Sequence, residues 1–119
     1  MRILIVSLLA GFLLVVPGSG LAHAKTCPAP AYPSANGRYT EGVKAKHIGC
    51  ADAYKLLTKQ YACRVKNGPE GRCVKLVMHF ACREDRYSDF YSPSFVSTVT
   101  CTSNRKKVTW SYEQSKTVA

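Results

Sequence analysis

The sequence lacks the residue patterns on which most enzymes and metal proteins depend. Among its 119 residues only three are histidine and seven are acidic. At least eight residues separate each cysteine from the next, whereas zinc sites favour close pairs such as C-x-x-C. No Ser/His/Asp order, phosphate-binding glycine loop or nucleotide signature is present. We therefore expect no metal or other cofactor, and binding rather than catalysis.

Long hydrophobic runs are also scarce, and the one that occurs lies at the start of the chain. Residues 3–16 form it, after the positive charge of Arg2 and before Pro17. The run is shorter than the ~20 residues that span a bilayer. A charged start, an apolar stretch and a small-residue cleavage site are the parts of a secretory signal peptide. The sequence thus predicts a signal peptide over residues 1–24 and a secreted, extracellular chain of residues 25–119 without a transmembrane segment.

Acidic residues are few relative to basic ones. The chain has 17 Lys and Arg against 7 Asp and Glu, a formal net charge of +10. Cleavage after residue 24 would remove one basic residue and no acidic one, which leaves +9. The length fits one small domain, and the 46% hydrophobic content is too high for a disordered polyelectrolyte. A folded basic domain of this kind attracts polyanions.

All six cysteines lie in the predicted mature chain, and an even number behind a signal peptide predicts three disulfides. Bridges would stabilise a domain whose small core is marginal by itself. The Gly- and Pro-rich segment 67–71 favours a local bridge between Cys63 and Cys73. The other four cysteines allow several pairings, among which we hypothesise Cys50 with Cys101 and Cys27 with Cys82.

Hydrophobic spacing predicts an α+β domain over residues 38–119 that follows a proline-rich arm over residues 25–37. Alternating apolar positions predict strands, a 3.6-residue spacing predicts one helix, and the polar and aromatic segment 84–92 is a predicted loop. The helix would present Tyr54, Leu57 and Tyr61 to the core. The predicted strands are 38–48, 72–83, and two that contain Val99 and Trp110 and flank a hairpin turn at 103–106. We expect a small antiparallel sheet of about four strands, packed on the helix and joined by three disulfides.

Three stretches of the sequence carry a family resemblance. They are Val43–Ala53, which leads a strand into a cysteine at a helix start, Phe80–Arg83, and Val99–Trp110, which places a cysteine in a basic hairpin. They resemble small secreted proteins common in actinomycetes, over about 70 of the mature residues. The resemblance implies a fold more than a function, because those proteins are uncharacterised and no catalytic residues carry over. Cys63 and Cys73 depart from their usual four-cysteine pattern, which fits a local addition.

The candidate binding residues are basic or aromatic. Lys44 and Lys46 share one face of a predicted strand, and aromatic residues in the predicted loop lie near Arg83 and Arg86. The complete set is Lys44, Lys46, Arg105, Lys106, Lys107, Tyr87, Phe90 and Tyr91. We expect salt-dependent binding of polyanions, such as nucleic acid, an acidic glycan, or an anionic wall or membrane surface. Lysines that only keep the domain soluble are the simpler alternative.

Two other functions stay open. The aromatic segment 85–92 has the residue types of an interface, so the protein could be an effector, inhibitor or toxin that binds a secreted protein partner. His47 and His79 are the histidines of the predicted mature chain, and together with a lysine they could act as base and acid in RNA cleavage. No known ribonuclease motif surrounds them, so this is the weaker hypothesis.

Overall fold

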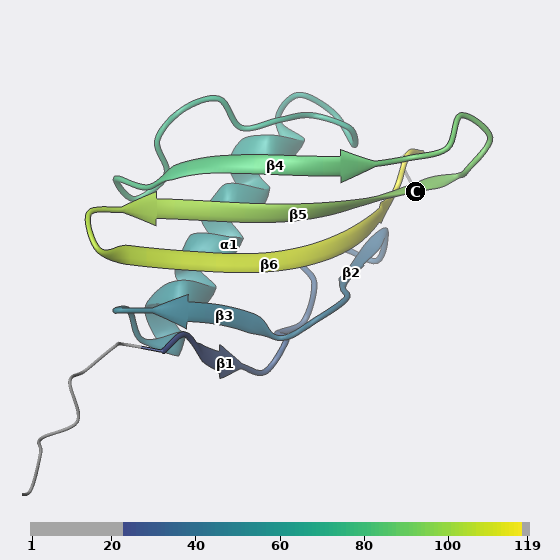
Figure 1. The fold of residues 1–119 in the computed structure, drawn as a ribbon. Coiled ribbons are helices and arrows are strands. Elements are labelled where there is room, and N and C mark those ends of the chain that lie inside the picture. Colours follow the sequence, from purple (N-terminus) through teal and green to yellow (C-terminus); the bar gives the residue numbers. More distant parts are fainter. Residues whose placement is uncertain (1–22, 118–119) are drawn as a thin grey trace, which may run out of the picture.

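The computed structural model describes residues 23–117, so the predicted signal peptide lies outside the described residues except for its last two positions. The elements are β1 (Lys25–Cys27), β2 (Gly37–Tyr39), β3 (Val43–Lys46), α1 (Cys50–Val65), β4 (Ala81–Tyr87), β5 (Ser94–Ser103) and β6 (Lys106–Ser115). All strands form one antiparallel sheet in the order β1-β3-β6-β5-β4, and β2 pairs with the last part of β6. Figure 1 shows α1 behind this sheet. The α+β class with one helix is confirmed, although the sheet has six strands rather than about four.

The β5–β6 hairpin supplies most of the apolar surface that α1 covers. Alternate residues of both strands point toward the helix and are at most 3% exposed, as the sequence pattern predicts. The turn at 103–106 also forms as predicted, with Asn104 at a positive φ of 51°, a region that Asn tolerates better than most residues. The core-facing hydrophobic residues of the hairpin are Phe95, Val99, Cys101, Val108, Trp110 and Tyr112.

The helix presents a different side to the core from the one predicted. Leu57 is buried as expected, but Tyr54 and Tyr61 are only half-buried. The Tyr54 hydroxyl donates a 2.7 Å hydrogen bond to the backbone oxygen of Pro28 at the edge of the fold. The buried positions of α1 are Ala53, Leu56, Leu57, Gln60 and Arg64. Because two of these are polar, hydrophobic spacing indicated the neighbouring stripe instead.

The predicted strand over residues 72–83 is wrong for most of its length. Val74 is 94% exposed and Leu76 is 64% exposed, although they were expected on an apolar face. A tight turn follows, in which the amide of Val77 donates to the Phe80 oxygen at 3.0 Å and the amide of Phe80 donates back at 2.8 Å. β4 begins only at residue 81 and runs to Tyr87, through part of the predicted loop. A strand needs a partner, and β5 offers one only from residue 81 onward.

The predicted strand over residues 38–48 divides at Gly42. Its two parts become β2 and β3, which pair with different segments of β6. A Cβ atom at Gly42 would lie 2.7 Å from the Thr26 methyl group and 3.0 Å from the Cys27 oxygen, so only glycine lets β1 approach so closely. The predicted proline-rich arm thus contributes a short edge strand to the sheet.

Three disulfides form, but only one pairing matches the sequence prediction. Cys63–Cys73 is confirmed. The hypothesised pairs Cys50–Cys101 and Cys27–Cys82 are wrong, because the observed bridges are Cys27–Cys50 and Cys82–Cys101. Cys82 and Cys101 lie directly opposite each other in the β4–β5 register. This adjacency depends on which strands pair, and the misplaced strand 72–83 concealed it.

Candidate functional site

The face of the sheet that points away from α1 carries polar side chains on every strand that crosses it. The register aligns them in rows, with about 4.8 Å between neighbouring strands. One row, from β1 to β4, contains Thr26, Lys44, Thr109, Thr100 and Arg83. The next row contains Lys46, Lys107, Thr102 and Ala81. Three lysines from two strands are therefore immediate neighbours, although about 60 residues separate Lys46 from Lys107 in the sequence.

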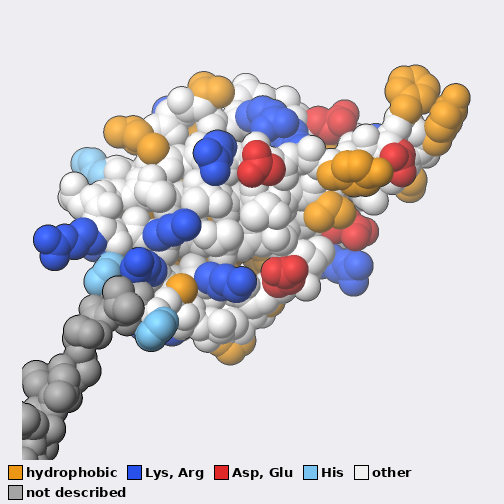
Figure 2. Space-filling view, in the orientation of Figure 1, with side chains coloured by type: hydrophobic (Ala, Val, Ile, Leu, Met, Phe, Trp, Pro, Cys, Tyr) orange, Lys and Arg blue, Asp and Glu red, His pale blue; other side chains and the backbone are white. Residues whose placement is uncertain are grey.

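We call Lys44, Lys46, Lys107 and Arg83 the basic end of the sheet. The three lysines are exposed and, with Thr109, His23 and Ala24, line a surface pocket of ≈ 330 Å³. Within residues 23–117, none of the observed ion pairs involves a side chain of the basic end. Figure 2 shows basic side chains mainly over the left and centre of this face and acidic ones in its centre and right. The structure thus brings positive charges to one end of the sheet, where they form no ion pair within the described residues.

The other predicted basic residues extend this end of the molecule. Arg105 lies in the β5–β6 turn and Lys106 begins β6, directly before Lys107, and both are exposed. They lie at the rim of the basic end rather than within its rows. All five predicted basic binding residues therefore gather at one end of the sheet, a grouping that follows from the pairing of β3 with β6.

The predicted aromatic residues lie at the opposite end. Tyr87 ends β4, and Phe90 and Tyr91 occupy the β4–β5 connection, where they are 91% and 93% exposed. Their two rings meet edge to face with centroids 5.2 Å apart. Along β4, Arg83 and Tyr87 are four residues apart, or about 13 Å. Arg86 points inward and pairs with Glu84, so it does not lie beside the exposed rings. The structure therefore separates the three aromatic residues from the basic end of the sheet.

The two candidate catalytic histidines are not on strands, contrary to prediction. His47 follows β3 and His79 lies in the turn before β4, with positive φ values of 56° and 66°. Both turns are at the same end of the sheet, but three strand spacings, about 14 Å, separate the strands that they adjoin. A base and an acid that cleave one phosphodiester must both reach its adjacent oxygens. This geometry does not favour the ribonuclease hypothesis.

A buried polar cluster lies between α1 and the sheet, and sequence reasoning missed it. Its centre is the carboxylate of Glu84, which accepts hydrogen bonds of 2.9–3.0 Å from four side chains. The donors are Gln60, Arg86, Ser97 and Tyr112. Burial by itself would raise the pKa of Glu84, but the Arg86 guanidinium and the other donors hold this pKa below its ordinary value.

The side-chain amide of Gln114, which both accepts and donates hydrogen bonds, continues the cluster. Its oxygen accepts from Arg64 Nη2 at 2.8 Å and from the Tyr32 hydroxyl at 2.6 Å, and its nitrogen donates to the Pro69 oxygen at 2.6 Å. The Arg64 guanidinium stacks 4.4 Å from the centre of the Tyr112 ring. Burial raises the pKa of Tyr112, and that of neighbouring Tyr39 to about 12. The one available sequence indication was the pair Gln60 and Arg64, spaced like core residues of the helix.

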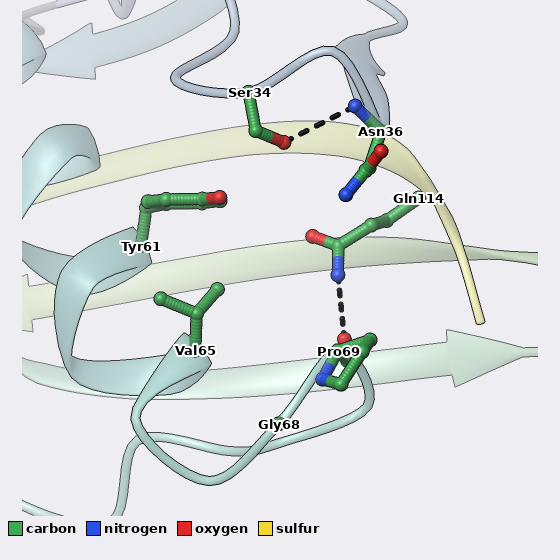
Figure 3. A pocket seen from close by; sticks show the side chains of 7 residues that line it. All are labelled: Ser34, Asn36, Tyr61, Val65, Gly68, Pro69 and Gln114. Carbon is green, nitrogen blue, oxygen red and sulfur yellow. Dashed lines mark hydrogen bonds between the residues drawn. The ribbon is translucent and has the colours of Figure 1, made fainter. Parts of the chain in front are cut away.

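A smaller pocket of ≈ 220 Å³ borders this cluster. Figure 3 shows Ser34, Asn36, Tyr61 and Gln114 around it, with the Gln114 amide turned to Pro69. Its remaining lining residues, Val65, Gly68 and Pro69, are uncharged. It is below the usual size of a small-molecule site and offers an anion no charged partner. The basic end of the sheet is therefore the stronger candidate for a functional site.

Residues 23–117 contain no helix able to cross a membrane. They also contain no group of three or more His, Cys, Asp and Glu side chains placed to hold a metal ion. A comparison of the chain with protein-family models, with curated proteins and with solved structures finds no match, so function is argued from the site itself.

Proposed function

We propose that the protein is a secreted binding module that holds polyanions on the basic end of its sheet. The observation that carries the proposal is the direct cross-strand opposition of Lys46 and Lys107, with Lys44 beside them. Like charges that face each other across a sheet are destabilising. A phosphate or sulfate group bound between these ammonium groups would convert the repulsion into attraction.

The composition of the basic end indicates which part of a polyanion it contacts. Thr100, Thr102 and Thr109 place hydroxyl groups between the lysines and Arg83, and hydroxyls donate to oxyanions. The large exposed hydrophobic residues of the described chain all lie outside these two rows. Stacking on nucleic-acid bases needs such side chains. We therefore infer contact with anionic backbone or substituent groups, with little dependence on sequence and strong dependence on salt.

Secretion belongs to the same proposal. All six cysteines are paired in disulfides, which persist in oxidising compartments. The predicted signal peptide and the resemblance to small secreted actinomycete proteins point the same way, and both stay hypotheses.

The test compares two variants that lose the same charge from different surfaces. Lys44, Lys46 and Lys107 are replaced by Gln in one variant, and Lys59, Lys66 and Lys75 in the control. The control lysines line a separate pocket beside α1. Binding to labelled heparin fragments and to labelled single-stranded RNA is measured by fluorescence anisotropy across a salt series.

We expect only the variant of Lys44, Lys46 and Lys107 to lose most of its affinity. In a plot of log affinity against log salt concentration, its slope should be less negative than that of the parent by about 2. Equal losses in both variants would mean that net charge, rather than the basic end, controls binding. RNA binding that ignores salt and disappears in a Phe90→Ser/Tyr91→Ser variant would contradict the proposal and assign binding to these exposed rings.

A further inference from the structure

The pocket at the basic end is walled in part by residues that precede the predicted cleavage site. His23 and Ala24 line it together with the three lysines and Thr109. Cleavage after Ala24 would remove both residues from the wall. The mature pocket would then be wider, and its lysines would be more accessible to an anion than they are in the precursor.

The same cleavage creates a new positive charge at this place. Lys25 is the first residue of β1, where it pairs with Ala45 of β3, between Lys44 and Lys46. Its backbone nitrogen is bonded to Ala24, a residue of the pocket wall. Once freed, this nitrogen becomes an α-ammonium group at the edge of the pocket, whereas in the precursor it is an uncharged amide.

The structure also limits how far the new terminus can move. β1 is paired with β3 through three consecutive residues, and Cys27 is joined to Cys50 at the start of α1. The free end is therefore only two residues from a covalent attachment to the core. A loose terminus would carry its charge into solvent, but this one stays next to the lysines.

We infer that removal of the signal peptide completes the anion site, by opening the pocket and by adding the α-ammonium of Lys25 as a fourth cation beside Lys44, Lys46 and Lys107. The inference rests on the proposed function, and it names the step that regulates that site. The preferred ligand is a group with several negative oxygens, a phosphate or sulfate cluster, because four cations converge on one pocket. The precursor binds such a group weakly, and the processed chain binds it well.

The experiment uses three forms of the folded, disulfide-bonded protein. The first begins at Lys25 with a free amino group, and the second is the same chain acetylated on its α-amino group. The third begins at His23 and is also acetylated, so that its added residues bring no terminal charge to the pocket. Ligation of a short synthetic amino-terminal peptide to the remaining chain gives all three forms. Inorganic tripolyphosphate is the probe, and calorimetric titration at low salt measures its dissociation constant.

We expect the acetylated form to bind about fivefold more weakly than the free form, the effect of one cation near an anionic surface. The form that begins at His23 should also bind more weakly, because His23 and Ala24 still line the pocket and narrow it. Thermal unfolding of the three forms should agree within about 2 °C, which separates a binding effect from a folding defect.

A control variant distinguishes failure of this inference from failure of the proposed function. Lys44→Gln/Lys46→Gln/Lys107→Gln is titrated in the chain that begins at Lys25. If this variant binds tripolyphosphate as well as the parent, the site itself is misplaced. If it binds weakly while acetylation and the His23 extension change nothing, the site stands and the role of the new amino terminus is refuted.

Discussion

Replacement of Glu84 by Gln is expected to destabilise the fold strongly, because this carboxylate supplies the negative charge that faces two buried arginines. Arg86 Nε lies 2.9 Å from Glu84 Oε2, and Arg64 Nε lies 3.9 Å from Oε1. The three side chains are 5%, 12% and 1% exposed for Glu84, Arg86 and Arg64, so water screens them little. Glutamine keeps the shape of the side chain but removes its negative charge. Its NH2 group, which donates, replaces one of the two oxygens that accept hydrogen bonds in the wild-type protein.

The expected loss in the free energy of unfolding follows from the cost of leaving one partner of a buried ion pair without its counter-charge, about 3–5 kcal/mol. Glutamine retains one acceptor, so we expect the lower end, about 3 kcal/mol. In a domain of this size, that loss lowers the melting temperature by roughly 12–24 °C. The matched control is Glu113→Gln, since Glu113 pairs with Arg38 at 3.4 Å on the exposed face. Surface pairs of this kind contribute about 0–1 kcal/mol.

Calorimetric melting and urea denaturation of the two variants, with disulfides intact, give the comparison. A loss in Glu84→Gln no larger than that in Glu113→Gln would refute the idea that the cluster stabilises the fold. Acid adds a second check. Because the folded-state pKa of Glu84 is lowered, its contribution is complete above its unfolded-state pKa and is lost as pH falls through the folded-state value. The wild-type protein should therefore lose more stability below about pH 4 than Glu84→Gln does.

Three further changes test other parts of the structure. Gly71→Ala would press a Cβ atom against the backbone oxygen of Arg64, so we expect a loss of about 1–3 kcal/mol in urea denaturation; an unchanged midpoint would contradict this packing. Lys107→Glu would place an opposite charge across from Lys46, so thermal melting should show a gain of about 0.2–1 kcal/mol while polyanion binding falls. Phe90→Ser removes a ring that is 91% exposed, and its melting temperature should stay within about 2 °C of the parent.

The sequence predicted the parts of the fold in which hydrophobic alternation and burial coincide. The β5–β6 hairpin is the clearest example, since Val99 and Trp110 sit in uninterrupted alternating patterns around a turn with Asn104. The prediction failed where the core is polar. Gln60 and Arg64 are buried together with Leu57, so the apolar stripe of the helix coincides only in part with its buried face.

Residues 72–83 show the opposite error, in which an apolar pattern is not buried. Val74 and Leu76 alternate like strand residues but face solvent. Cys63–Cys73 fixes the start of this segment to the end of α1, and the turn closed between Val77 and Phe80 reverses it before β4 begins. Periodicity records which residues can share a face, but a covalent link and a long-range partner decide whether that face forms.

The candidate site was predictable in its residue types but not in its grouping. Lys46 and Lys107 were each identified from local clusters, and only the β3–β6 register makes them neighbours. The two rows of side chains that contain these lysines include no acidic residue. Glu84 instead lies on the core side of the sheet, where it pairs with Arg64 and Arg86. The fold thus pairs its buried arginines with its own carboxylate, whereas the exposed cations of the basic end form no ion pair within the described residues. Since Lys44, Lys46 and Lys107 stand on the paired strands β3 and β6, an anion that spans them meets cations that the sheet has already brought together.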